Sequence, residues 1–457
     1  MSPRRIIAIT SAASFLAPLN SSMVAVGLPR IRDDFHIGVG PLTLLVSVYL
    51  VAVAVSQPVS GKLGDAIGCR RMILIGLGAL FVSSLGAALA WNFWVLVAWR
   101  ALQGVSAAMV MPNGVAYLRR SLDSNTLGRS LGYNGAAISA GAAMGPVFGG
   151  LVLSLSNWRA MFLVNVPAAA VIALFILTLA PDKPATAARP RIDFASLGAL
   201  AAAFAGLVVL GNAARLHNPA LVVGGFLALP VAATAYLILY RRRQSGVVDL
   251  RLFSRPDYAS SAMTTALSNL VMYTALIFIP IYLDELRHAS EAAIGLILFS
   301  LSVSTVIVSP FSGRLSDSRG HRLPAVTGGA FILAGAAGLV AAVGEFAPWG
   351  VAVPLGALGL GMGLMGAAQQ SSALRAWGTE VAGAASGTLS MMRYVGSVGG
   401  AALMAAIVGS SPTVGEVRAL TAVLAMFAVA NIVVAAFVGS RRQTAPESQP
   451  AGSRAPA

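Results

Sequence analysis

Long apolar runs alternate with short polar segments along almost the whole chain. Each run is about 20 residues long, the length that a helix needs to cross a ~30 Å hydrocarbon core. We place these runs at residues 6–28, 42–60, 72–90, 94–117, 130–154, 160–180, 194–213, 219–240, 258–283, 292–312, 324–344, 349–374, 383–409 and 418–440. The pattern predicts an all-α polytopic membrane protein with 14 transmembrane helices.

One polar segment occurs twice. Residues 61–71 read GKLGDAIGCRR and lie between the second and third spans, and residues 313–322 read GRLSDSRGHR between the tenth and eleventh. Gly, Leu, Asp, Gly and Arg recur at a constant offset of 252 positions. Each copy is interpreted as a short charged turn. A membrane chain that carries one hairpin turn twice is predicted to contain two related halves, as secondary transporters do.

The two turns occupy equivalent places only if the seventh and eighth spans are an insertion between two six-helix bundles. We therefore expect a first bundle at residues 1–180 and a second at 258–440. Residues 181–257 would hold the two inserted helices and their cytoplasmic linkers, and 441–457 a disordered tail. The inserted helices carry few polar groups, so we expect them to face lipid or to pack at the periphery.

The charge distribution predicts orientation. Only 10% of the residues are charged, and the formal net charge is +15. If the amino terminus is cytoplasmic, the predicted cytoplasmic segments hold 23 of the 31 Lys and Arg residues. This asymmetry follows the positive-inside rule and places both termini in the cytoplasm. The basic charge therefore does not indicate a nucleic-acid partner.

The amino-acid composition also limits which cofactors, metals and disulfides the chain could hold. Cys69 is the only cysteine, and the four histidines show no ligand spacing, so we expect no disulfide and no metal site. No G-x-x-x-x-G-K-S/T phosphate loop occurs, which argues against an ATP-driven pump. We expect no cofactor. The adjacent Asp33 and Asp34 give only thin support for a membrane enzyme with metal-assisted chemistry.

Three further motifs follow the first turn in order. Residues 100–104 read RALQG in the fourth span, residues 141–150 read GAAMGPVFGG in the fifth, and residues 158–167 read WRAMFLVNVP at the start of the sixth. Together with the repeated turn they resemble the major facilitator superfamily, in its fourteen-helix drug:proton antiporter branch. The resemblance extends from the first span to the last.

The resemblance implies that the repeated segment is a cytoplasmic gate. Its aspartate could accept bonds from a helix amino terminus or pair with an arginine across the two bundles. The gate residues would be Gly61, Asp65, Gly68, Arg70, Arg71, Gly313, Asp317 and Arg322. The alternative is a plain basic turn on the cytoplasmic side.

The fifth-span motif favours export over uptake, again by resemblance. Glycines four residues apart allow close approach of another helix, and a proline bends its own helix. The residues are Gly141, Gly145, Pro146, Gly149 and Gly150. Generic packing of small residues is the alternative.

Proton coupling is harder to place. The resemblance assigns Arg100 a role in proton exchange, although its side chain could instead extend to the outer interface. Asn20 stands where the resemblance expects a carboxylate, and no carboxylate lies deep in a span. We hypothesise that Asp284 or Glu285 carries the proton, or Asp65 together with Arg100. A rival hypothesis is that the substrate itself carries the proton.

Polar and aromatic residues inside the spans are candidates for a substrate pocket, although about half could simply bond between helices. They are Asn20, Ser21, Tyr49, Gln57, Gln103, Asn113, Tyr133, Asn134, Asn269, Tyr273, Gln369, Gln370 and Arg393. Arg393 has no acidic neighbour in its span. We hypothesise that Arg393 and Arg100 make the pocket neutral to positive and disfavour permanent organic cations.

These observations predict a secondary active exporter of small amphipathic compounds, such as an antibiotic or a secondary metabolite. It would be a monomer in the bacterial inner membrane and would exchange its substrate for protons by alternating access. The alternatives are an uptake or exchange carrier for a polar metabolite and a proton-independent facilitator.

Overall fold

The computed structural model describes residues 2–37, 44–123, 126–182, 193–215, 231–232, 234–241, 246–289, 291–343, 348–408 and 413–439. The regular elements in this part of the chain are all helical, which confirms the predicted all-α class. The helices are α1 (Pro3–Phe35), α3 (Leu44–Ile67), α4 (Cys69–Ala88), α5 (Phe93–Ser121), α6 (Leu127–Leu155), α7 (Trp158–Leu163), α8 (Asn165–Leu177), α9 (Phe194–Arg215), α11 (Pro256–Ile281), α12 (Glu291–Arg319), α13 (Arg322–Ala342), α14 (Ala352–Arg375), α15 (Ala382–Ile407) and α16 (Val414–Ala435).

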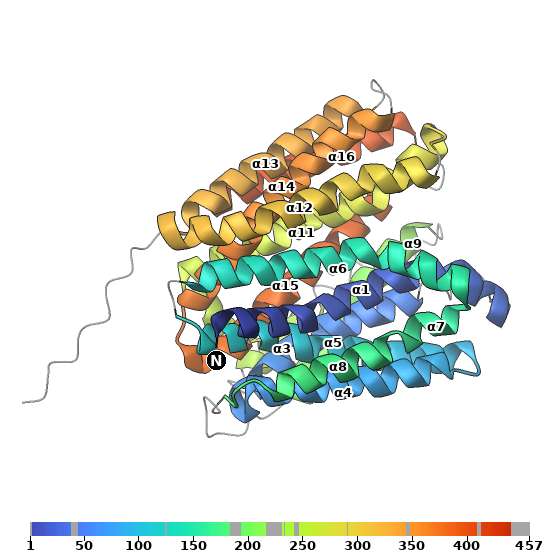
Figure 1. Cartoon of the computed structure of the whole chain (residues 1–457). Helices are drawn as coiled ribbons and strands as arrows, with labels where there is room; N and C mark the ends of the chain where they lie inside the picture. The colour runs from blue at the N-terminus through green and yellow to red at the C-terminus, as the bar shows by residue number, and fades with distance from the viewer. Residues whose placement is uncertain are drawn as a thin grey trace, which may run out of the picture.

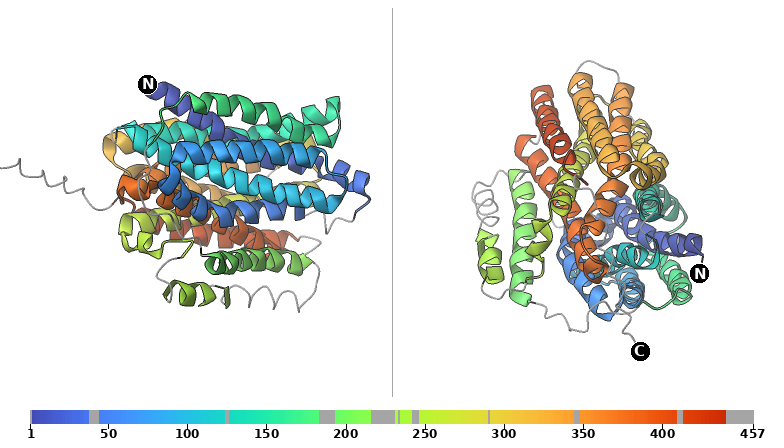
Figure 2. Two further views of the ribbon diagram at one scale, coloured as in Figure 1. Left: turned by 90° about the horizontal axis from the view of Figure 1, so that it is seen from below. Right: turned by 90° about the vertical axis from the view of Figure 1, so that its left-hand side faces the viewer.

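The long helices form two bundles that lie side by side (Figure 1). Helices α1 to α8 form the first bundle, and α11 to α16 form the second. Two helix pairs make most of the interface, α6 with α12 and α3 with α15. Helix α9 packs against α15 and α3 at the edge of the assembly (Figure 2).

Ten described helices are long and apolar enough to cross a membrane, and the bent helix α6 makes an eleventh. Every predicted span except the eighth coincides with a described helix. The eighth, at 219–240, falls largely outside the described residues. A total of 14 spans therefore stays a prediction.

The outer surface of the bundles is apolar. Large side chains such as Leu174, Phe175, Val147 and Val433 are each more than half exposed on helices that pass the length and hydropathy test. A soluble monomer rarely exposes so much contiguous apolar surface. This surface is suited to contact with lipid chains.

The repeated segment is not a turn throughout, which corrects the sequence-based prediction. Helix α3 continues to Ile67 and α12 to Arg319, so the first seven residues of each copy are helical. No proline or helix-stopping cap interrupts them. The chain turns only at Gly68, with φ of 99°, and at Gly320, with φ of 82°. Glycine adopts such positive φ values without the steric penalty that other residues meet.

The first bundle contains a close contact between α1 and α6. A Cβ atom added at Gly141 would lie 2.4 Å from the Phe15 carbonyl oxygen, and one at Gly145 would lie 1.8 Å from Ser22 Oγ. Gly149 similarly faces Met23, whereas a Cβ at Gly150 would meet nothing within 4 Å. The helix bends by about 40° between Gly145 and Val147, at the position of the proline.

The glycine spacing generates a paired prediction. Gly141→Ala should destabilise the protein by about 1–3 kcal/mol, because its methyl group would collide with backbone of α1. Gly150→Ala is the matched control: it adds the same methyl group to the same helix in open space and should be neutral or slightly stabilising. Thermal unfolding in detergent measures both. Equal unfolding temperatures would contradict the packing described here.

Candidate functional site

Asp65 joins the two bundles at one end. Its side chain is almost wholly buried on α3. The carboxylate accepts hydrogen bonds from the backbone N–H groups of Gly383 and Ala384, both at 2.8 Å. These are the second and third residues of α15, whose amino-terminal N–H groups have no partner within the helix. The helix dipole also favours a negative charge at this position.

Asp317 makes the same contact in the opposite direction. From α12 in the second bundle it accepts bonds from the N–H groups of Gly128 at 2.9 Å and Arg129 at 2.8 Å. These are the second and third residues of α6 in the first bundle. Each bundle therefore caps one helix of the other. We call the end that carries Asp65 and Asp317 the gate end, and the opposite end the far end.

Two arginines complete the gate end. Arg120, near the carboxyl end of α5, donates to Asp65, to Asp182 at 3.3 Å and to the Thr379 carbonyl oxygen at 3.2 Å. Arg375, at the end of α14, donates to Asp317 at 3.1 Å. Sequence reasoning missed both arginines. Each ends a span directly before a polar segment, and that position was the available signal.

The arginines predicted for the gate contact other groups. Arg70 donates from Nε to the Ile176 carbonyl oxygen at 3.1 Å and from Nη2 to that of Leu177 at 2.6 Å, both on α8. Its backbone N–H bonds to Asp182. Arg71 and Arg322 are exposed. These three arginines therefore do not form the ion pairs of Asp65 and Asp317 in this structure.

Glycines allow the bundles to touch here. A Cβ atom at Gly61 would lie 2.0 Å from the Gly383 carbonyl oxygen, and one at Gly313 would lie 2.3 Å from that of Gly128. Because these obstacles are backbone atoms, a side chain at either position would push the helices apart. Each copy of the segment thus provides an aspartate that bonds to the opposite bundle and a glycine that lets the two helices approach closely enough for that bond.

Apolar packing also joins the bundles at the gate end. One buried cluster includes Leu118 and Leu127 of the first bundle together with Tyr258, Leu374 and Ala385 of the second. The far end of the first bundle has a separate cluster, around Phe162, which includes no residue of the second bundle. At that end Asp34 binds Arg159 at 2.9 Å and Trp158 Nε1 at 3.0 Å, within one bundle.

Two titratable side chains outside the spans, Asp34 and His321, have perturbed pKa values. The hydrogen bond from Trp158 lowers the pKa of Asp34, with a smaller contribution from Arg159. Burial and the nearby Arg375 lower the pKa of His321 to about 4. His321 is therefore neutral at neutral pH and shares a hydrogen bond of 2.9 Å with Ser371. It adds no positive charge beside Arg375.

Arg100 lies inside the first bundle. It is fully buried, donates to the Leu45 carbonyl oxygen at 3.2 Å and to Gln103 Oε1 at 2.9 Å, and lies 4.3 Å over the ring of Tyr49. The alternative of a side chain that extends to the outer interface is thus wrong. Arg100 Nη2 has no hydrogen-bond partner among the described residues.

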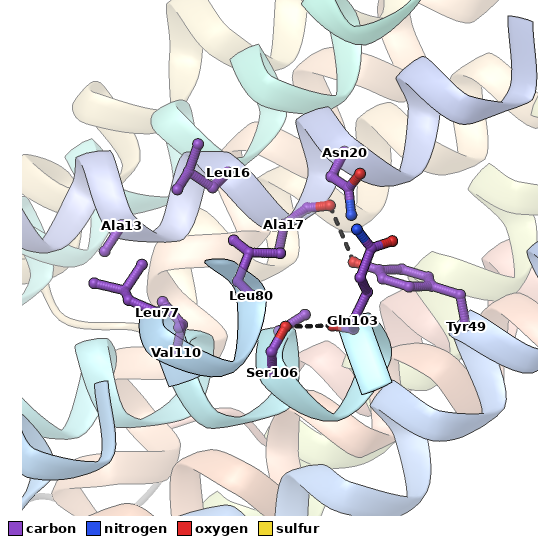
Figure 3. A pocket seen from close by; sticks show the side chains of 11 residues that line it. Ala13, Leu16, Ala17, Asn20, Tyr49, Leu77, Leu80, Gln103, Ser106 and Val110 are labelled. Carbon is purple, nitrogen blue, oxygen red and sulfur yellow. Dashed lines mark hydrogen bonds between the residues drawn. The ribbon is translucent and has the colours of Figure 1, made fainter. Parts of the chain in front are cut away.

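Asn20, Tyr49 and Gln103 converge on one small cavity between α1, α3, α4 and α5 (Figure 3). Asn20 accepts a bond from Asn165 Nδ2 at 3.1 Å, the Tyr49 hydroxyl donates to the Ala17 carbonyl oxygen, and Gln103 donates to Ser84. The cavity has room for little more than one water molecule. These three residues are together, but in a bonded cluster within one bundle and not in a drug-sized pocket.

The other predicted pocket residues are spread more widely. Tyr133 lies at the gate end, where its hydroxyl accepts a bond from Arg314 at 3.4 Å. Asn269 bonds to Thr265 of its own helix, and Asn113 to Ser60 and Met109. Side-chain amides of Gln57, Asn134 and Gln369 are buried without a full set of partners. Ser21 is partly exposed and Gln370 is buried.

Arg393 and Tyr273 are the two predicted residues that lie together in the second bundle. Arg393 on α15 interacts electrostatically with Tyr273 of α11 and with Tyr394. Tyr394 packs in an apolar cluster with Tyr49 of the first bundle. All three members of this group are partly exposed. They lie where the two bundles face each other.

The proton-coupling candidates come from different helices. Asp284 and Glu285 belong to the π-helical turn Tyr282–Leu286 after α11, and their side chains lie outside the described part. Asp65 binds Arg120, which follows Arg100 by 20 residues on α5, a separation of ~30 Å. Asp65 and Arg100 are therefore not in contact in this structure, and their joint role in proton coupling stays a hypothesis. No group of three or more His, Cys, Asp or Glu side chains among the described residues is arranged to hold a metal ion.

Sequence comparison identifies the family. A sequence profile for the Major Facilitator Superfamily matches residues 10–401. The chain belongs to this superfamily. Its fold and membership are those of membrane transporters, and the two bundles with apolar surfaces agree with this class.

Known members of the superfamily differ in what they transport. The chain is 30% identical to the tetracenomycin C resistance and export protein of Streptomyces glaucescens, over 68% of this chain and 59% of that protein. It is 24% identical to the riboflavin transporter RibZ of Clostridioides difficile, over 79% of this chain and 78% of that protein. The crystal structure of the human organic anion transporter MFSD10 superposes with a TM-score of 0.69 over 95% of this chain and all of that chain, at 15% identity. The last similarity shows the fold alone.

The aspartate contacts predict how the gate end responds to mutation. Asp65→Asn removes the charge that pairs with Arg120 and should weaken closure by about 2 kcal/mol, or roughly 30-fold. Cys69 is fully buried at this end and is the only cysteine, so its rate of modification by a maleimide measures opening. The rate should rise in Asp65→Asn. It should not change in Asp33→Asn, which alters an exposed ion pair at the far end. Equal rates in the two variants would contradict the assignment.

Proposed function

We propose that the chain is a secondary active exporter of small amphipathic compounds in the bacterial inner membrane. It works by alternating access between its two six-helix bundles, which two inserted helices connect. The observation that supports this proposal most directly is the reciprocal capping of α15 by Asp65 and of α6 by Asp317. All four bonds lie at the same end of the interface, which suits a carrier whose two ends open alternately.

The distribution of basic residues supports a cytoplasmic location for the gate end. In that orientation the structure is closed toward the cytoplasm. Export is supported by the glycine-rich stretch of α6 and by the resemblance that it carries. The similarity to a protein named for tetracenomycin C export supports the same direction.

Opening toward the cytoplasm would break four backbone hydrogen bonds and move Asp65 and Asp317 away from the opposite bundle. The loss would be compensated by hydration of these groups and by substrate binding. Gln57 is fully buried with both amide atoms unpaired. Its burial costs free energy in the closed state, and contact with water in the other state would remove that cost.

A proton gradient would supply the energy. Arg100, Asp284 and Glu285 are the residues that we propose for coupling, and a proton carried by the substrate is the alternative. The similarity to a protein named as a riboflavin transporter favours a second candidate function, an uptake or exchange carrier for a polar metabolite.

Transport in inverted membrane vesicles tests direction and coupling together. In inverted vesicles the cytoplasmic face of the membrane is outside, so an exporter moves its substrate into the lumen. Vesicles that contain the protein should therefore accumulate fluorescent amphipathic compounds when their lumen is made acidic. Collapse of the pH gradient should reduce the initial rate at least about tenfold. Gly313→Val should also reduce it, since the side chain would meet the Gly128 backbone, whereas Gly78→Val, in open space on α4, should have little effect.

Accumulation by intact cells and not by inverted vesicles would instead support the uptake carrier. Export that persists after collapse of the pH gradient would overturn proton coupling while leaving export in place. Loss of transport in both glycine variants would show that the gate contact has no special role.

A further inference from the structure

Arg393 is a positive charge near the middle of the bundle. It lies ten residues after Gly383 on α15, which places it ~15 Å from the gate end of a helix that spans the bundle. Charged side chains at such depth usually pair with each other or face water or a ligand. The surroundings of Arg393 therefore decide what it does.

No acidic side chain in the described part of the chain forms an ion pair with Arg393. Its electrostatic neighbours are the phenol groups of Tyr273 and Tyr394, which are uncharged when protonated. The described acidic residues lie near the ends of the bundle, as Asp34, Asp65 and Asp317 do. The charge of Arg393 is thus not neutralised by a carboxylate of the protein.

Arg100 provides a second uncompensated charge on the other side of the interface. Its partners are a carbonyl oxygen, an amide oxygen and the ring of Tyr49. Tyr49 interacts electrostatically with Tyr273 and packs in one cluster with Tyr394. Tyrosines from α3, α11 and α15 therefore lie between the two arginines. Two guanidinium groups therefore flank these tyrosines without a described carboxylate to balance them.

Arg100 and Arg393 differ in access. Arg100 is fully buried and bonded, whereas Arg393, Tyr273 and Tyr394 are all partly exposed. The second group is therefore the more accessible of the two, and within it the Tyr273 side chain hydrogen-bonds to Ser397. Met391 and Met392 pack beside Tyr394 in an apolar cluster, and methionine adapts to apolar ligands of varied shape.

We infer that Arg393, Tyr273 and Tyr394 bind the negatively charged group of the substrate, and that the substrates are amphipathic organic anions such as aromatic carboxylates. The guanidinium group pairs with the carboxylate, as it does at many carboxylate-binding sites. The tyrosines offer aromatic surface and hydroxyl donors. This inference rests on the proposed transport function and adds the class of substrate to it.

Binding to the purified full-length chain in lipid nanodiscs tests the inference, with three probes that share one ring system. The probes are 2-naphthoate, 2-naphthamide and 2-naphthylmethylammonium, which are anionic, neutral and cationic. Isothermal titration calorimetry should show that the wild-type chain binds 2-naphthoate at least about tenfold more tightly than the other two. Equal or tighter binding of the cation, or absence of any preference, would overturn the inference.

Substitutions test whether the preference for the anionic probe depends on Arg393 and Tyr273. Arg393→Gln should abolish the preference for 2-naphthoate and leave binding of 2-naphthamide unchanged, so the amide controls for folding. Arg393→Lys should keep part of the preference, because it keeps the charge but loses the planar fork. Tyr273→Phe should weaken 2-naphthoate severalfold. A preference that survives Arg393→Gln would overturn the assignment of this residue.

The same materials separate this inference from the proposed function. If 2-naphthoate binds in the Arg393-dependent manner but no vesicle preparation transports it, the anion site stands and transport fails. If vesicles transport neutral or cationic compounds and Arg393→Gln changes neither rate nor selectivity, transport stands and the anion site fails.

Discussion

A carboxylate that accepts two hydrogen bonds from the first turn of a helix in the opposite bundle is the interaction on which contact between the bundles at the gate end depends. Asp65 does this for α15 and Asp317 for α6, so each bundle holds the other at the same end. The contact needs a carboxylate, an uncapped helix and two backbones in near contact. Gly61 and Gly313 provide the last condition, because any side chain there would meet opposing backbone atoms. Arg120 and Arg375 balance the two negative charges.

The interior of the bundles differs from the gate end in how its charges are paired. At the gate end Asp65 and Asp317 are paired with Arg120 and Arg375, whereas Arg100 and Arg393 carry positive charge within the bundles without a carboxylate partner among the described residues. Movement of the two bundles about their interface would open the gate end by breaking charge–dipole contacts and would widen access to the arginine and tyrosine group. A negatively charged substrate would then interact with Arg393 in the state that binds it.

Sequence periodicity predicted much of this architecture. The 252-residue offset predicted two bundles, and it correctly aligns the turns at Gly68 and Gly320. The sequence pattern could not show that Arg120 and Arg375 bind the aspartates, because they come from other helices and their offset is not 252. It also could not show that Asn20 and Gln103 belong to a bonded cluster within one bundle, since both periodicity and polarity suit a pocket equally well. Arg393 was singled out by its lack of an acidic neighbour in its span, but its proximity to Tyr273 of another helix comes from the folded arrangement.

Pulsed electron–electron double resonance, which measures distances between two spin labels, tests the central claim that the two aspartates hold one end closed. In a Cys69→Ala background, one label pair at Arg71 and Arg322 would report the gate end, and a second at Arg30 and Val414 the far end; all four positions are exposed. In the double variant Asp65→Asn with Asp317→Asn, we predict that the gate-end distance lengthens and the far-end distance shortens. Unchanged distances at the gate end would contradict the account, as would a lengthening at both ends together.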